Sequence, residues 1–229
     1  MKHYFSKAEW ILWMGSLATV LLCFALFGGE GYLSLAASLL GVTALIFCAK
    51  GHPAGQVMIL VFSCLYGYIS FTFAYYGEMI TYLCMTAPMA VVALVSWLTH
   101  PYKGNRAQVS VGRLAGKDWG WLALLTVSVT VVFYFILAYF HTANLIPSTV
   151  SVTTSFAAAF LTYKRSPWFA LVYAANDLVL IVLWGLASLA DPSYVSVLVC
   201  FAVFFVNDLY GFLNWRRMGK AQRRETVAP

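Results

Sequence analysis

Two aspartates interrupt long apolar segments in the second half of the chain, and each of them follows an asparagine. Asp177 and Asp208 stand in two copies of the same tripeptide, Asn-Asp-Leu. A carboxylate that faces lipid costs on the order of 3 kcal/mol on insertion scales, so such residues usually face a cavity or tie helices together. Because adjacent helical residues point about 100° apart, we expect only one member of each pair to face a given cavity.

Further polar and aromatic side chains lie at helical spacing around these pairs. On the last apolar segment, Asn207, Tyr210 and Asn214 form one polar stripe at i, i+3 and i+7. Asparagine supplies paired donors and acceptors, and aromatic faces attract flat cations. The pattern therefore predicts a site for a polar small molecule. The expected substrate-contacting residues are Asn176, Asn207, Tyr210, Asn214, Trp184, Tyr173, Tyr66 and Asp177.

Eight apolar segments must position these residues. Each is long enough to cross a hydrocarbon core of about 30 Å at 1.5 Å per residue. With 62% hydrophobic and 10% charged residues, the composition predicts an all-α polytopic membrane protein. No gap is long enough for a separate soluble domain, so any chemistry takes place within the helix bundle. The segments are 10–27, 32–49, 56–76, 79–99, 119–140, 145–163, 167–189 and 194–215.

The charged residues are sorted between the gaps. All 14 Lys and Arg fall in alternate gaps or at the two ends of the chain, whereas the opposite gaps hold Glu30, Glu78, His141 and Asp191. By the positive-inside rule, this predicts cytoplasmic N- and C-termini in a multi-pass protein of the cell membrane. The net charge of +6 is explained by this topology and by the attraction of a basic tail to anionic lipid. We therefore expect no nucleic-acid partner.

The sequence offers little for catalysis. The five cysteines are scattered singly through apolar segments, and the four histidines lie outside the segments or at their edges. No H-x-x-x-H, G-x-S-x-G or phosphate-cradling glycine loop is present in the sequence. We expect neither an enzyme nor a bound metal or cofactor. A sensor is also disfavoured, because the chain has no soluble output domain.

A weak internal repeat relates segments 2–4 to segments 6–8. At an offset of 114, Lys50 aligns with Lys164 and Pro53 with Pro167, whereas Trp97 and Trp215 align at an offset of 118. This predicts parallel three-helix bundles at 32–99 and 145–215, joined by a linker helix at 119–140. An extra N-terminal helix at 10–27 and a basic cytoplasmic tail at 216–229 complete the expected division. Parallel repeats of this kind build transporters with a site near the midplane.

Three stretches resemble the PnuC family of nicotinamide riboside transporters. They are SPWFALVYAANDLVLIVLW (166–184), CFAVFFVNDLYGFLNWRRM (200–218) and LYGYISFTFAYYGEM (65–79). The resemblance implies a fold similar to that of SWEET sugar transporters with an additional N-terminal helix. It also implies a homotrimer and facilitated diffusion, with the substrate trapped by cytoplasmic phosphorylation. Asn176 matches the asparagine of the family's aromatic-plus-Asn motif, and Val172 stands where the family often has tryptophan.

The substrate remains open among several candidates at this point. Nicotinamide riboside is a flat cation with an amide and ribose hydroxyls, which suits carboxylates, aromatic faces and asparagines. Thiamine is also a flat cation, and relatives similar to this family carry thiamine or deoxynucleosides. Coupling to Na⁺ or H⁺ through Asp177 or Asp208 is a further alternative to simple facilitated diffusion.

Overall fold

The computed structural model describes residues 4–27, 31–72, 76–142, 144–190 and 192–227. In the described chain, eight helical stretches are long and apolar enough to cross a membrane, as the sequence predicts. The elements are α1 (Lys7–Phe27), α2 (Tyr32–Ala49), α3 (Ala54–Thr72), α4 (Tyr76–Ile80), a π-helix (Thr81–Thr86), α5 (Ala87–Thr99), β1 (Pro101–Tyr102), β2 (Asn105–Val109), α6 (Gly116–Tyr139), α7 (Leu145–Tyr163), α8 (Trp168–Ala190), a 3₁₀ turn (Pro192–Tyr194) and α9 (Val195–Val227).

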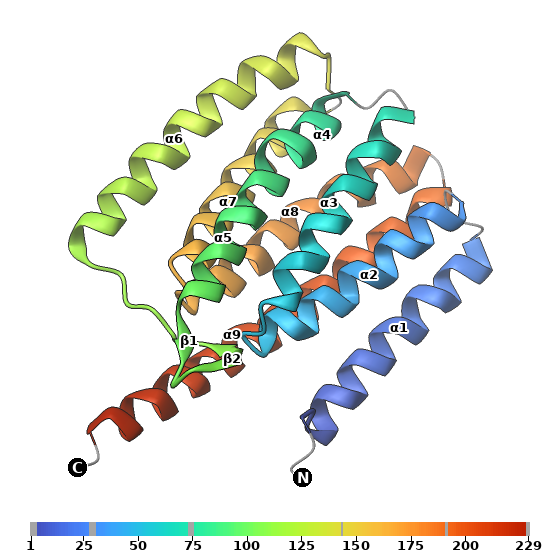
Figure 1. Cartoon of the computed structure of the whole chain (residues 1–229). Coiled ribbons are helices and arrows are strands. Elements are labelled where there is room, and N and C mark those ends of the chain that lie inside the picture. The colour runs from blue at the N-terminus through green and yellow to red at the C-terminus, as the bar shows by residue number, and fades with distance from the viewer. Residues whose placement is uncertain (1–3, 28–30, 73–75, 143, 191, 228–229) are drawn as a thin grey trace.

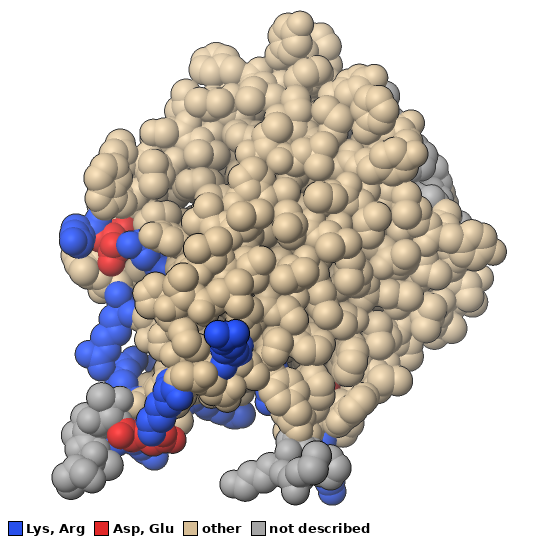
Figure 2. Space-filling view, viewed as in Figure 1, with Lys and Arg blue, Asp and Glu red and all other residues tan. Residues whose placement is uncertain are grey.

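The helices pack as a single bundle in which α2, α3 and α5 face α7, α8 and α9 (Figure 1). Between these two groups, α2 contacts α9 and α5 contacts α7, while α1 lies on α2 and α9 and α6 lies on α7. The start of α1 and the end of α9 lie at the same end of the bundle as the two strands (Figure 1). Lys and Arg side chains gather there on the face drawn in Figure 2, and we call it the basic end.

The basic end holds two features that the sequence did not predict. Strands β1 and β2 form a hairpin whose two turn residues, Lys103 and Gly104, have φ of 48° and 76°, as a type I′ turn requires. This short hairpin is an addition to a fold that is mostly helical in the described chain, as the sequence predicts. In addition, α9 continues through most of the expected tail 216–229. The Gln222 side chain explains this, since it bonds to the backbone of Val109 and Val111 beside the hairpin.

The fourth span changes its helical geometry halfway. Tyr76–Ile80 and Ala87–Thr99 are α-helical, whereas Thr81–Thr86 is a π-helix immediately before Pro88. Proline lacks the N–H that would bond four residues back, so the turn before it widens and its carbonyls find other partners. A proline within a span commonly kinks the helix, and here a π-helical segment ends two residues before Pro88. That segment faces the centre of the bundle.

Candidate functional site

A cavity of about 160 Å³ lies between the two groups of helices. It extends from Glu78 and Ser148, near the end opposite the basic end, down to Cys48 and Phe169. The lining surface is mostly apolar and rich in aromatic side chains, with polar groups placed among them, which is typical of small-molecule sites. The aromatic lining residues are Phe62, Tyr66, Tyr82, Phe169, Tyr173, Trp184, Phe201 and Phe204. Among the described residues that line the cavity, three carry carboxyl groups and none is Lys, Arg or His.

Asn176 is the best-positioned amide in this cavity. Its side chain lies on α8, and two hydroxyls of α7 donate hydrogen bonds to its Oδ1, Ser151 at 3.0 Å and Thr154 at 2.8 Å. Ser151 and Thr154 are three residues apart and therefore share one face of α7. They hold the amide by its oxygen and leave the Nδ2 donors without a hydrogen bond in the described part of the chain. Asn176 can thus donate to a ligand from a fixed position.

Asp177 and Asp208 form the second polar element of the cavity. Their carboxyl groups, from α8 and α9, lie within hydrogen-bonding reach of each other, and the residues are 4% and 6% exposed. Oδ2 of Asp177 has no hydrogen-bond partner among the described residues. Two buried carboxyl groups at this distance cannot both be ionised unless a positive charge lies beside them, and without one they share a proton. The pair therefore favours a cationic ligand.

The structure corrects the expectation that only one member of each Asn-Asp pair faces a given cavity. Asn176 and Asp177 both line it, because the cavity extends around α8 widely enough to meet two faces about 100° apart. In the second pair, Asp208 lines the cavity and Asn207 does not. Asn207 instead donates from Nδ2 to Ser16 of α1 at 2.9 Å.

The predicted aromatic residues lie at the cavity. Tyr66, Tyr173 and Trp184 all line it. The Tyr66 ring packs 4.7 Å, centroid to centroid, from that of Tyr82 on the π-helix, and Trp184 packs 5.4 Å from Tyr194. Val172, where the family often has tryptophan, instead packs at the basic end, against the cluster that contains Trp97 and Trp215.

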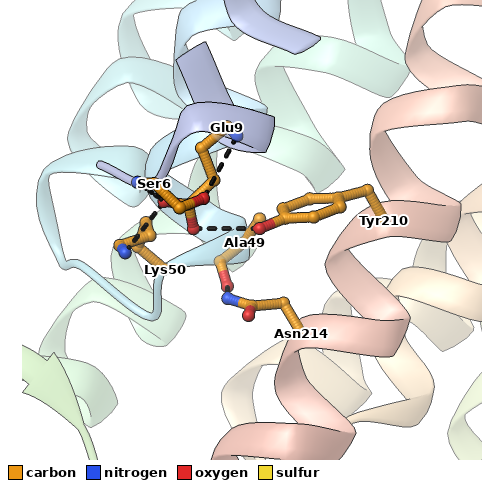
Figure 3. Close-up of polar contacts among 6 residues, drawn as sticks. All are labelled: Ser6, Glu9, Ala49, Lys50, Tyr210 and Asn214. Atoms are coloured by element: carbon orange, nitrogen blue, oxygen red, sulfur yellow. Dashed lines mark hydrogen bonds and ion pairs between the residues drawn. The ribbon is translucent and has the colours of Figure 1, made fainter. Parts of the chain in front are cut away.

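The remaining predicted residues, Tyr210 and Asn214, tie helices together outside the cavity (Figure 3). Tyr210 donates to Oε1 of Glu9 at 3.0 Å, and Asn214 donates to the Ala49 carbonyl at 2.8 Å. The polar stripe of α9 therefore faces α1 and α2. Sequence reasoning missed this because it began the first span at residue 10, so that Glu9 was not counted among the carboxylates within spans.

Glu9 is the centre of this helix-tying cluster. It is 3% exposed and accepts from Lys50 at 3.1 Å and from the Ser6 backbone N–H at 2.7 Å (Figure 3). A buried carboxylate is tolerated when its acceptor sites are filled in this way. Burial, and to a smaller extent the nearby Glu9 carboxylate, raises the pKa of Tyr4 to about 12. The cluster fixes α1 against α2 and α9.

The cavity is closed at the basic end by three aromatic side chains, Trp97, Phe169 and Trp215, which we call the basic-end closure. Trp97 and Trp215 are fully buried, and their rings lie 5.3 Å apart. Nε1 of Trp97, on α5, donates to the Thr162 carbonyl of α7 at 3.0 Å. Nε1 of Trp215, on α9, donates to the Cys48 carbonyl of α2 at 2.8 Å. Each tryptophan thus bonds across to the other group of helices.

A second pair of hydrogen bonds joins the two groups of helices in the same reciprocal way. Ser96 donates to the Tyr163 carbonyl at 2.7 Å, and Asn214 donates to the Ala49 carbonyl at 2.8 Å. Ser96 and Asn214 differ by the offset of 118, and Ala49 and Tyr163 differ by 114, as the repeat in the sequence predicts. The two groups of helices therefore make equivalent contacts at the basic end.

Several lining residues were not predicted as site residues. Asp208 can be recognised in the sequence as a carboxylate within a span, but the prediction favoured the stripe of Asn207, Tyr210 and Asn214 on the same helix. Ser151, which lines the cavity, and Thr154, which bonds to Asn176, belong to one hydroxyl-rich segment, but serine and threonine in spans commonly bond to their own backbone. Glu78 also lines the cavity, from α4, although the sequence placed it in a gap because the spacing put the fourth span at 79–99.

Comparisons with known proteins find the same transporter family that the sequence resembles. A family model described as nicotinamide mononucleotide transporter matches residues 31–217. The nicotinamide riboside transporter PnuC of Neisseria mucosa is 26% identical over 221 residues, covering 93% of this chain and 82% of the relative. The protein of that name from Haemophilus influenzae is 21% identical over 194 residues, covering 83% and 82%. A crystal structure of the vitamin B3 transporter PnuC matches with a TM-score of 0.81 and 24% identity, over 95% of this chain and 94% of that one, which shows a shared fold.

Proposed function

Because the chain belongs to the nicotinamide mononucleotide transporter family, we propose that it carries nicotinamide riboside into the cell by facilitated diffusion. It is a membrane transporter and not an enzyme. The family description names a phosphorylated substrate, whereas the two relatives are named for the riboside. The charge of the cavity favours the riboside.

The observation that carries this choice is the composition of the cavity lining. Asp177 and Asp208 lie together in it, and the described lining residues include no Lys, Arg or His. A phosphate group brought beside two carboxyl groups would be repelled and would lack a cationic partner. Nicotinamide riboside carries a fixed pyridinium charge and no phosphate. Its cation offsets the repulsion within the Asp177–Asp208 pair, so the same cavity that rejects the mononucleotide binds the riboside.

The contacts can be assigned by chemistry. Nδ2 of Asn176 donates to an acceptor of the substrate, such as a ribose hydroxyl or the carboxamide oxygen. The rings of Tyr66, Tyr82 and Trp184 offer faces for the flat cation. Thiamine, also a flat cation, is the second candidate, because it would interact with the same carboxyl pair. A neutral deoxynucleoside fits less well, since it leaves that pair uncompensated.

Transport requires the closed end of the cavity to open. The basic-end closure lies between the cavity and the end where the positive charges gather, and we propose that substrate leaves through it. The present cavity of about 160 Å³ is below the 300–1,000 Å³ typical of sites for drug-sized ligands. Binding a nucleoside therefore needs movement of the lining helices. The two groups of helices, as parallel bundles of the SWEET type joined by α6, are the bodies that would rock.

Orientation, assembly and trapping complete the proposal. We place the basic end in the cytoplasm of a cell-membrane protein, by the positive-inside rule, and propose a homotrimer in the lipid bilayer. Phosphorylation of the riboside in the cytoplasm adds a charge that the carboxyl pair repels, which prevents return.

An impermeant thiol reagent outside intact cells should label a cysteine at His141 and spare one at Arg224, both exposed. The reverse pattern would contradict this orientation.

The substrate test is a binding and transport comparison on the purified protein. Calorimetry should rank nicotinamide riboside first, with thiamine as the nearest competitor and with the mononucleotide and thymidine far weaker. In proteoliposomes, riboside should equilibrate without exceeding the outside concentration, and neither a Na⁺ nor a pH gradient should shift that end point. Equal affinity for riboside and mononucleotide would refute the charge argument. Accumulation under an imposed ion gradient would refute facilitated diffusion.

A further inference from the structure

The turns that follow α2 and α7 have the same backbone shape but different residues. At the offset of 114, Gly51 aligns with Arg165, and their φ angles are +67° and +55°. Glycine adopts this left-handed region freely, whereas a residue with a side chain is uncommon there and is strained. Strain of this kind is found where a side chain has a specific task.

The Arg165 guanidinium has no ion-pair partner among the residues that the structure describes. Its Nε and Nη1 atoms are buried and lack a hydrogen-bond partner among the described residues. The neighbouring Lys164 bonds to Asp118 at 2.8 Å, just as Lys50 bonds to Glu9 in the other turn, but none of the ion pairs in the described chain includes Arg165. Burial lowers the pKa of Arg165, as expected for a cation shielded from water. This turn therefore has one positive charge more than its partners neutralise.

A groove of about 460 Å³ opens beside this arginine, between α5 and the end of α7. Its polar part lies at the basic end and includes Ser96, Thr99 and His100 with Lys164 and Arg165. Its apolar part climbs α5 away from that end, along three valines that share one helix face. Val91, Val92 and Val95 are 42%, 44% and 55% exposed. The groove thus joins a cationic pocket at the membrane boundary to an apolar wall within the span.

We propose that this groove binds one anionic glycerophospholipid from the leaflet at the basic end. The phosphate lies in the polar part of the groove, beside the Arg165 guanidinium, because a guanidinium donates charge-assisted hydrogen bonds to phosphate oxygens. One acyl chain follows the valine face of α5. Basic pockets between membrane helices suit anionic headgroups in this way. The site is separate from the substrate cavity, because the two share no lining residue.

The test uses the purified full chain and phospholipids with matched acyl chains. Native mass spectrometry should show phosphatidylglycerol retained in preference to phosphatidylcholine. Arg165→Gly is the informative variant, because glycine fits the backbone at this position as Gly51 does in the other turn. It should remain folded and lose retained phosphatidylglycerol by on the order of tenfold or more, since it loses a charge-assisted contact to the phosphate. Arg106→Asn, at an exposed site of the same end, should retain the lipid as the wild type does.

Thermal unfolding gives a second readout. Phosphatidylglycerol should raise the melting temperature of the wild type and not of the Arg165→Gly variant, because a ligand that binds only the folded protein stabilises it. Equal retention by the Arg165→Gly variant and the wild type would overturn the proposal, and so would equal retention of both lipids by the wild type. Stabilisation by free inorganic phosphate alone would assign the site to a soluble anion. Disulfide cross-linking between subunits through a cysteine at Val92 would show a second copy of the chain in the groove, against a lipid.

Discussion

The basic-end closure should open more often when one of its indole donors is removed. Trp215→Phe keeps an aromatic ring, although a smaller one, and deletes the Nε1–H that bonds to the Cys48 carbonyl at 2.8 Å. That carbonyl still accepts from the Gly51 N–H at 2.9 Å, so no orphaned acceptor adds to the effect. The net loss is at least that of one ordinary hydrogen bond, about 1 kcal/mol, because the smaller ring also leaves part of a buried site unfilled. If the bond exists only in the closed state, the open population should rise roughly fivefold.

Cys48 itself reports this change. It lines the bottom of the cavity and is 6% exposed, so a bulky thiol reagent added from the basic end reaches it only when the closure opens. With the other four cysteines replaced by alanine, we expect labelling of Cys48 to accelerate about fivefold in Trp215→Phe, in line with one lost hydrogen bond. Trp97→Phe should give the same increase, because its bond to Thr162 at 3.0 Å is equivalent.

The second variant and a control make the result interpretable. Trp97 bonds to α7 and not to the Cys48 carbonyl, so faster labelling in Trp97→Phe cannot come from a local change at the reporter. Trp10→Phe makes the same substitution at a site 46% exposed on α1 and should leave the rate unchanged. Unchanged labelling in both closure variants would refute the view that these bonds hold the cavity shut.

Three further outcomes are expected. Asn176→Ala should weaken riboside binding by roughly 5- to 150-fold, the effect of removing a buried hydrogen-bonding partner. Asn207→Ala should instead lower thermal stability and leave the calorimetric affinity intact. Weaker binding by the Asn207→Ala variant with unchanged stability would return Asn207 to the site. Glu9→Gln should lower the melting temperature, because it leaves the partly buried Lys50 without its carboxylate, and a stable variant would show that α1 is held by apolar contacts alone. Burial lowers the pKa of His52, whose Nδ1 accepts a hydrogen bond from the Ala54 N–H. The stability that neutral His52 contributes is therefore present above about pH 6.5 and declines as the pH falls. His52→Asn keeps an acceptor at acid pH, and identical melting curves of the wild type and this variant at pH 5 would contradict this role.

The spans could be predicted from the sequence because hydrophobic length and charge asymmetry are local properties. All eight expected segments begin within about three residues of the corresponding helical stretches. The hairpin at 101–109 could not be predicted in that way. Its strands are two and five residues long, and Val109 is buried only because Gly51 and Gln222 meet it from distant parts of the chain.

The candidate site was predicted in part, for a related reason. A carboxylate within a span is costly wherever it lies, so Asp177 and Asp208 could be recognised as special without knowing the fold. Which side of a helix faces a cavity depends on its neighbours. The stripe of Asn207, Tyr210 and Asn214 is polar because α1 brings Glu9 and Ser16 to it and the end of α2 supplies a carbonyl. Periodicity locates such a stripe and cannot identify its partner.

The exchanged bonds at the basic end also bear on how such a chain could arise. The tryptophan that ends each group of three helices bonds to the first helix of the other group, so neither group can close by itself. Two identical copies of one group, related by a two-fold axis along the membrane normal, would form the same bond twice. A symmetric dimer of half-length chains could therefore have the closure before any gene fusion. A single additional helix, in the position of α6, is what joining two parallel copies in one chain requires.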